Sequence, residues 1–213
     1  MHRYDRPLIA VALCLAALAG FVDALGFLSM GGFFVSFMSG NTTHLAVAIG
    51  SVDPAPAWRA ATLIIAFIAG VMAGTLVAHA VPFQRKPAVL AAVTLLLTAA
   101  ALCHMLQFDQ AALLLTAVAM GAENGVFQRD GEVTIGVTYM TGTLVRFAQR
   151  AALALVGGDG RGWPSYLLLW LGFIAGALVG TGIFLLTGLN ALWIAAGICA
   201  VMTATVARLV RIR

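Results

Sequence analysis

Two short polar stretches interrupt an otherwise apolar chain, and they decide how it folds. Residues 37–44 read FMSGNTTH, and residues 139–146, 102 positions later, read YMTGTLVR. They lie inside the apolar runs 33–50 and 134–156, yet they carry hydroxyl, amide, imidazole and guanidinium groups. Irregular backbone within a bilayer is tolerated only where it is buried in protein or lines a water-filled cavity. The two stretches therefore predict broken helices inside a membrane domain.

The composition of the whole chain agrees with a membrane domain. Of its 213 residues, 62% are hydrophobic and 9% are charged, whereas soluble domains carry roughly 25% charged residues. A spanning helix takes about 20 residues, so helices use up the length and leave no soluble catalytic domain. We expect a single membrane domain over residues 1–213, with the lipid bilayer as its partner. The net charge of +4 orients helices in a membrane and indicates no nucleic-acid partner.

Apolar runs divide the chain into eight segments. They are too long and too uniformly apolar for the alternating strands of about ten residues that build an outer-membrane barrel. We therefore expect an all-α integral membrane protein. The runs fall at about 8–28, 33–50, 58–81, 88–107, 110–128, 134–156, 164–187 and 190–209.

The chain also repeats itself. The 102-residue shift that superimposes the polar stretches places His44 on Arg146, and it places the glycines of 70–74 on those of 172–176. A shift smaller by one or two residues sets 20–24 beside 121–125. The pattern predicts two repeats of about four segments each, at about 8–107 and 110–209. Small-residue faces of this kind let helices approach closely, and they suit a homodimer or a contact within the chain equally well.

The basic residues favour one topology. If all eight segments cross the membrane, Arg85, Lys86 and Arg129 lie outside, against the positive-inside tendency. If the two polar segments instead enter and leave on the same side, six spans remain and every basic residue except Arg59 is cytoplasmic. Both termini are then cytoplasmic, and each repeat has three crossings, so the two repeats have inverted topology. We prefer this arrangement of six full spans and two broken or re-entrant segments.

The polar stretches supply the candidate substrate-binding residues. The N–H groups at the start of a half-helix, together with nearby hydroxyls, suit an anionic or polar solute. In this interpretation glycines permit the helix breaks. The alternative is that the polar side chains only cap kinks and join helices. The candidates are Ser39, Gly40, Asn41, Thr42, His44, Thr141, Gly142, Thr143 and Arg146.

Asp23 and Glu123 are the acids in comparable places of the two repeats. An ionisable side chain at membrane depth costs at least about 2.5 kcal/mol to insert, so each needs a partner or a function. One interpretation makes them proton-coupling groups beside the broken helices. The other makes them structural ion pairs with Arg146 or His44.

Enzyme motifs do not explain the chain. It has no zinc-protease H-E-x-x-H, no phosphate-binding glycine loop and no G-x-S-x-G elbow. Its three cysteines have no ligand partners at metal-binding spacing. We expect no enzyme, no metal and no cofactor.

Two stretches carry a resemblance to a known family. Residues 20–27, GFVDALGF, followed by residues 34–43, FVSFMSGNTT, resemble the YoaK-like family of bacterial inner-membrane proteins, a domain of unknown function. The resemblance covers essentially the whole chain. Family members usually carry Gly-x-Gln-Asn-Ala and Thr-Gly-Thr in the second half, which here read GAENG at 121–125 and TGT at 141–143. Glu123 departs from the usual glutamine. The resemblance implies a polytopic bacterial membrane protein and no particular substrate.

Together these features predict a bacterial inner-membrane transporter or channel for a small polar or anionic solute. The alternative is a non-transporting membrane subunit or sensor whose polar motifs only pack helices.

Overall fold

The fold is a bundle of eight α-helices, seen in a computed structural model that describes residues 6–129, 132–133, 136, 138–158 and 162–211. The all-α prediction is confirmed, because the strands in the described part are two residues each. The α-helices are α1 (Arg6–Met30), α2 (Met38–Gly50), α3 (Pro54–Ala80), α4 (Arg85–Met105), α5 (Asp109–Glu123), α6 (Met140–Leu155), α7 (Trp163–Thr187) and α8 (Leu192–Arg211). Short elements join them: the 3-10 helices η1 (Pro82–Gln84), η2 (Asn124–Phe127) and η3 (Gly188–Ala191), and the antiparallel strands β1 (Gln128–Arg129) and β2 (Glu132–Val133).

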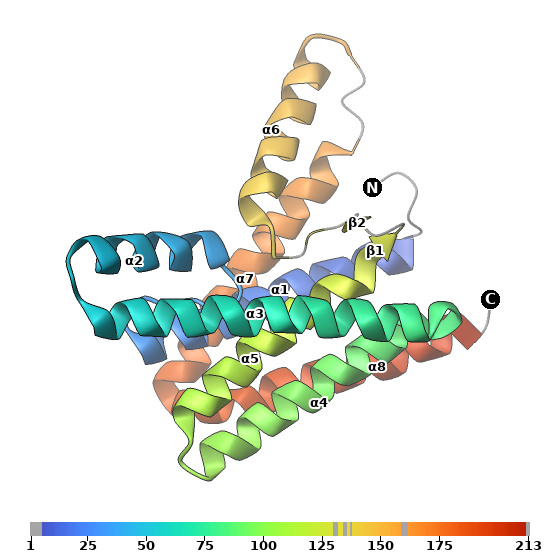
Figure 1. The fold of residues 1–213 in the computed structure, drawn as a ribbon. Coiled ribbons are helices and arrows are strands. Elements are labelled where there is room, and N and C mark those ends of the chain that lie inside the picture. The colour runs from blue at the N-terminus through green and yellow to red at the C-terminus, as the bar shows by residue number, and fades with distance from the viewer. Residues whose placement is uncertain (1–5, 130–131, 134–135, 137, 159–161, 212–213) are drawn as a thin grey trace.

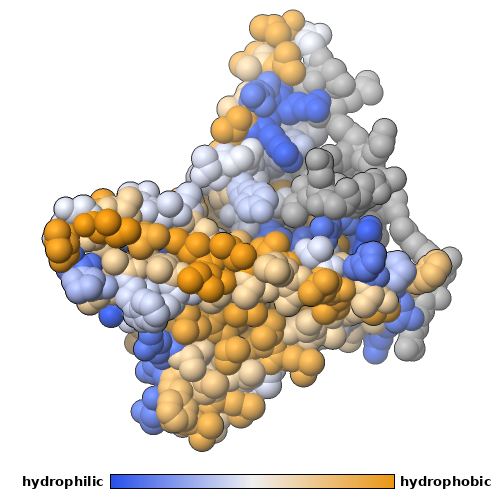
Figure 2. Space-filling view, in the orientation of Figure 1, coloured by the Kyte–Doolittle hydropathy of each residue, from blue (hydrophilic) through white to orange (hydrophobic). Residues whose placement is uncertain are grey.

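Long apolar helices make up most of the molecule. Within the described residues, four segments are long and apolar enough to cross a membrane: Ile9–Met30, Pro54–Ala80, Pro82–Met105 and Trp163–Val210, the last of which contains α7 and all but the last residue of α8. Hydrophobic residues gather over α3 and over the hairpin of α4 and α5, whereas hydrophilic residues gather over the middle of α6, whose far end is hydrophobic (Figure 2). The outer surface of the long helices therefore suits contact with lipid.

Glycines set the distance between two pairs of helices. A methyl group on Gly70 or Gly74 of α3 would collide with the backbone of α5, at Val118 and Ala122. These glycine faces are therefore used within the chain. Successive glycines of α3 meet successive turns of α5 in the same order, so these two helices run in the same direction.

The same packing joins α7 to α1. Gly176 lies against Ala17, and Gly180 lies against Phe21. By their contacts, Gly176 and Gly180 of α7 are therefore equivalent to Gly70 and Gly74 of α3. The 102-residue shift instead pairs Gly70 and Gly74 with Gly172 and Gly176, one helical turn earlier. The shift grows after α6 begins: α6 has 16 residues and α2 has 13, which accounts for three of the four added positions.

The polar segments contain shorter helices than the apolar runs predicted. The run 33–50 is helical only from Met38, and in the described part of the run 134–156 the helix begins at Met140. The predicted helix 110–128 ends at Glu123 and continues as η2. In Figure 1, α2 lies along the first half of α3, while α6 and the start of α7 extend away from the other helices.

Candidate functional site

The first polar segment is an extended return loop bound to α1. Gly31 and Gly32 adopt positive φ angles of 68° and 106°, which turn the chain after α1 at a conformation that glycine accepts without strain. The loop then meets Asp23: Oδ1 accepts the N–H groups of Val35 at 2.9 Å and Ser36 at 2.7 Å. The Ser36 hydroxyl donates to Oδ2 at 2.5 Å. The Asp23 carboxyl thus replaces the hydrogen bonds that a helix would have supplied here.

Asn41 fixes the same loop from the other side. Its Oδ1 accepts the N–H of Phe34 at 3.0 Å, and its Nδ2 donates to the carbonyl of Phe34 at 2.7 Å. Asn41 is fully buried in the first turn of α2. Because its amide pairs with both backbone groups of one residue, α2 is held against the loop that precedes it.

The second polar segment has a similar but uncharged anchor. Asn124 is buried at the start of η2, and the hydroxyl of Thr138 donates to its Oδ1 at 3.2 Å. Thr143, also buried, donates to the carbonyl of Tyr139 at 3.1 Å. Asn124 and Thr138 therefore do in the second half what Asp23 and Ser36 do in the first.

The two polar segments meet at one cavity of about 250 Å³. Its walls come from the residues where each extended stretch passes into its helix, together with one aromatic ring of α3. They are Ser36, Phe37, Met38, Ser39, Phe67, Thr138, Tyr139, Met140, Thr141 and Gly142. The residues at the N-cap positions of α2 and α6, Phe37 and Tyr139, make no capping side-chain hydrogen bond among the described residues. Two helix N-termini, each with the partial positive charge of its macrodipole, thus begin at this cavity.

The predicted site residues fall into three groups. Ser39, Thr141 and Gly142 line the cavity. Asn41 and Thr143 lie behind it, and their side chains hold the backbone. The others lie further along the two helices: Gly40, Thr42 and His44 on α2, and Arg146 on α6.

The members of the third group have different surroundings. Thr42 is exposed and donates to the carbonyl of Met38 at 2.8 Å. The His44 ring stacks on Phe33, with 4.6 Å between ring centroids. Arg146 is exposed, one helical turn from the cavity.

The glycines of the polar stretches do not make the breaks that the sequence suggested. Gly40 and Gly142 lie in the first turns of α2 and α6 and have no positive φ angle. A methyl group on Gly40 would collide with the Phe37 ring, whereas one on Gly142 would meet no atom within 4 Å. The chain turns instead at Gly31 and Gly32, because the turn needs positive φ angles, which glycine adopts without strain.

The two acids are not equivalent. Asp23 accepts hydrogen bonds from the return loop. Glu123 is fully buried, and neither of its carboxyl oxygens has a hydrogen-bond partner among the described residues. Gly20 packs on the carbonyl of Phe173, and Gly121 packs on the carbonyl of Phe67, so contacts match these two glycines. When the two repeats are aligned on these glycines, Asp23 is equivalent to Asn124 and not to Glu123. Neither acid forms an ion pair with Arg146 or His44 among the interactions of the described residues.

Sequence reasoning missed the residues that complete the cavity. The aromatic residues Phe37 and Tyr139 line it from matching positions, immediately before α2 and α6. Ser36 and Thr138 precede them and bind the anchors. The 102-residue shift aligns Ser36 with Thr138 and Phe37 with Tyr139, so it could have identified all four. Aligning Gly20 with Gly121 identifies Asn124 as the equivalent of Asp23.

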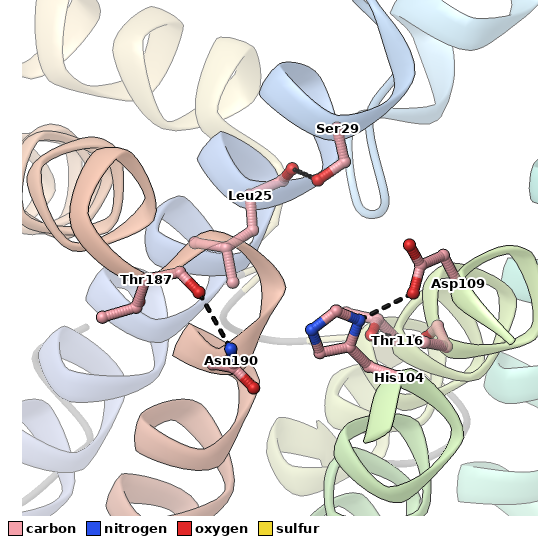
Figure 3. Close-up of polar contacts among 8 residues, drawn as sticks. Leu25, Ser29, His104, Asp109, Thr116, Thr187 and Asn190 are labelled. Atoms are coloured by element: carbon pink, nitrogen blue, oxygen red, sulfur yellow. Dashed lines mark hydrogen bonds and ion pairs between the residues drawn. The ribbon is translucent and has the colours of Figure 1, made fainter. Parts of the chain in front are cut away.

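A second cavity, of about 400 Å³, lies where the end of α1 meets the starts of α3 and α5. Arg59 lines it, donates to the carbonyl of Met30 at 3.1 Å and lies over the Phe33 ring, 5.5 Å from its centroid. Nearby, at the turn between α4 and α5, His104 Nδ1 and Asp109 Oδ1 lie 2.6 Å apart and point toward each other (Figure 3). This contact lies at an exposed helix turn.

Comparisons with known proteins agree with the membrane fold. The profile of a family described as "Protein of unknown function (DUF1275)" matches residues 11–205. The UPF0700 transmembrane protein RA0705 of Rhizobium meliloti (strain 1021) is 33% identical over 188 residues, covering 87% of this chain and 80% of the relative. The UPF0700 transmembrane protein YoaK of Bacillus subtilis (strain 168) is 32% identical over 148 residues, covering 66% of this chain and 64% of the relative. No solved structure matches the chain significantly. The chain is a membrane protein and belongs to the DUF1275 family, as the YoaK-like resemblance of its polar motifs indicated.

Proposed function

We propose that this protein is a transporter or channel that moves a small polar or anionic solute across the bacterial inner membrane. The observation that carries the proposal is the cavity of about 250 Å³ shared by the two polar segments. Ser39 and Thr141, which carry hydroxyl groups, line it, and two helices begin there without a capping side chain at the N-cap position. Half-helix N-termini that point at an anionic group of the substrate are a feature of secondary transporters.

We also propose that the polar segments are re-entrant. With a rise of 1.5 Å per residue, the 13 residues of α2 reach about 20 Å, which is less than the roughly 30 Å of the hydrocarbon core. Arg59, near the start of α3, bonds the last carbonyl of α1. The end of α1 and the start of α3 are therefore neighbours, as expected if the intervening segment returns to the side from which it entered.

Inverted repeats follow from this topology. Three crossings in the first half place the second half in the opposite orientation. The matched contacts of α3 with α5 and of α7 with α1 support a pseudo-twofold relation between the halves. Both termini are then cytoplasmic, and the shared cavity lies near the axis. In the same proposal, Asp23 and Glu123 belong to the machinery that couples solute movement to protons.

Solute flux tests the proposal most directly. Purified protein in liposomes is given a mixture of small carboxylates, phosphates and neutral polar metabolites, and the internal contents are analysed by mass spectrometry. We expect accumulation of a small set of solutes, which the cavity-lining substitution Thr141→Val abolishes. The matched control is Thr205→Val on α8, where an exposed threonine bonds only its own helix, at Val201.

A second measurement separates passage from packing. Ser39→Cys and Thr141→Cys, in a background without Cys14, Cys103 and Cys199, are exposed to a membrane-impermeant thiol reagent from each side. A solute cavity predicts labelling at both positions. A folded protein whose cysteines are labelled from neither side, and which accumulates no solute, would contradict the proposal and favour a subunit or sensor.

A further inference from the structure

Glu123 differs from the other buried polar side chains of the described residues, because they have hydrogen-bond partners. It ends α5, its side chain has no solvent exposure, and both carboxyl oxygens lack a hydrogen-bond partner. Among the described residues, no other buried side-chain nitrogen or oxygen lacks a partner. Nearly all buried polar groups in native proteins are paired, so such an exception calls for a physical explanation.

The described residues around Glu123 include no buried basic side chain. The Asp23 carboxyl of α1 disfavours a charge on Glu123, and Glu123 in turn acts on the Cys199 thiol of α8. The helices α3 and α4, which also pack on α5 and η2, contribute no buried basic side chain among the described residues. An ionised Glu123 would thus have neither an opposite charge nor a hydrogen bond, and it would face a second acid. A protonated carboxyl carries no charge and avoids these costs.

Asp23 lacks these properties, although it is also buried. Its two oxygens accept hydrogen bonds from Val35 and Ser36. These bonds fix the return loop, so changing the charge of Asp23 would disturb the loop itself. Of the two buried acids, Glu123 is the one that can exchange a proton without breaking a bond to another residue.

Glu123 is also linked to the cavity through its neighbour. Asn124 donates to the carbonyls of Met120 and Gly121 in the last turn of α5. It also accepts from Thr138, which lines the cavity. Glu123 is thus the direct neighbour in sequence of the residue whose hydrogen bond positions the second polar segment.

We propose that Glu123 is a proton-binding site, whose carboxyl holds a proton in the arrangement of Figure 1 and releases it when the end of α5 opens toward the cavity. On release the O–H bond breaks, its electron pair stays on the carboxylate oxygen, and the proton passes to a water molecule entering from the cavity. The charged carboxylate then attracts that water and disfavours return of η2 to its closed packing. The use of this proton to drive solute rests on the proposed function, whereas the binding itself does not.

Infrared difference spectroscopy tests the proton site without any solute. The full chain in liposomes is stepped between neutral and alkaline pH, and the C=O stretch of a protonated carboxyl is followed. The chain has only two glutamates, Glu123 and Glu132, so labelling with [13C]glutamate in the Glu132→Gln background marks the band of Glu123. We expect a high-frequency band of a carboxyl without hydrogen bonds at neutral pH, which shifts with the label and disappears at alkaline pH.

Two variants sharpen the assignment. The band should be lost in Glu123→Gln, which keeps the shape of the side chain, and retained in Asp23→Asn. A wild-type protein without a label-sensitive band, or a band that Asp23→Asn removes, would overturn the proposal. Because the isotope shift is read in a chain that keeps Glu123, the result stands even if Glu123→Gln does not fold.

Flux measurements distinguish this proposal from the proposed function. If no solute moves but the label-sensitive band titrates, the proton site stands and solute passage fails. If solute moves and Glu123→Gln reduces uptake to the rate measured without a pH gradient, both stand. If Glu123→Gln retains gradient-driven uptake, the coupling role of Glu123 is refuted.

Discussion

In the first half of the chain the stretch leading into the short helix is bound by a carboxylate, and in the second half the matching place holds an amide. Asp23 accepts three hydrogen bonds from Val35 and Ser36, whereas Asn124 accepts one from the described residues of the second segment, from Thr138. Hydrogen bonds to a charged group contribute about 1.5–3 kcal/mol each, and neutral ones about 1 kcal/mol. The first segment is therefore held more firmly than the second.

The short helices differ in the same direction. The helix α2 packs along α3 and is tied to its return loop by Asn41. The helix α6 packs only on α7 among the described elements with substantial contacts. Regions with fewer packed contacts and fewer buried hydrogen bonds open at lower free energy. The comparison indicates that a conformational change at the shared cavity involves mainly the second half, where Glu123 also lies.

The largest effect is expected for membrane sidedness, which decides whether the two halves are inverted at all. In a background without Cys14, Cys103 and Cys199, a membrane-impermeant reagent should label Ser51→Cys only from outside and Lys86→Cys only from the cytoplasm. Labelling is all-or-none, because the two positions lie on opposite faces if α2 is re-entrant. The reverse pattern would mean that all eight helical segments cross and that the halves are parallel.

Much of this arrangement could be predicted from the sequence, because long apolar runs and duplicated polar motifs are local signals. The positions at which α2 and α6 begin, after Phe37 and Tyr139, could not be predicted, because they depend on side chains that are distant in sequence. Asp23 lies 13 residues from Ser36 and replaces helical hydrogen bonds there. The cavity residues were predicted in part, at Ser39, Thr141 and Gly142. Asp23 and Glu123 were predicted in comparable places; the contacts of Gly20 and Gly121 align Asp23 with Asn124, so Glu123 lies one residue earlier in the repeat.

Glycine packing should show the next largest effect and tests whether the halves use equivalent contacts. Gly176→Ala places a methyl group against the backbone of Ala17, and such overpacking costs about 1–3 kcal/mol. Gly70→Ala should cost a similar amount at Val118. Gly182→Ala, in the same helix α7 with no atom within 4 Å, is the matched control. Thermal unfolding in detergent measures the differences.

Gly172→Ala separates the two possible registers of the repeat. The 102-residue shift pairs Gly172 with Gly70, but its methyl group would meet the Leu13 carbonyl at an ordinary contact distance of 3.4 Å. We therefore expect a much smaller loss of stability than for Gly176→Ala. Equal losses would contradict the one-turn displacement between sequence repeat and contact repeat.

Substitutions at the two anchor residues, Asp23 and Asn124, should show the next smaller difference in stability. Asp23→Ala leaves the buried N–H groups of Val35 and Ser36 without acceptors, at about 1–3 kcal/mol for each unsatisfied group. Asn124→Ala removes three neutral hydrogen bonds of the described residues, one with Thr138 and two with the carbonyls of Met120 and Gly121. Each is worth about 1 kcal/mol, and the two carbonyls stay in the last turn of a helix, so the loss should be smaller than for Asp23→Ala. Asp23→Asn should fall between them, since its amide oxygen still accepts from the backbone. If Asn124→Ala is as damaging as Asp23→Ala, the charged anchor is not the stronger one.

The smallest effect concerns the two glycines at the starts of the short helices, and here the halves should respond with opposite sign. Alanine is favoured over glycine in helices by about 0.5–1 kcal/mol. Gly142→Ala meets open space and should gain up to this amount. Gly40→Ala pushes the Phe37 ring, which lines the cavity, so the gain should be cancelled or reversed. Comparing unfolding midpoints and the labelling rate of Ser39→Cys in each background tests this, because a displaced Phe37 ring changes access to the cavity from one half only.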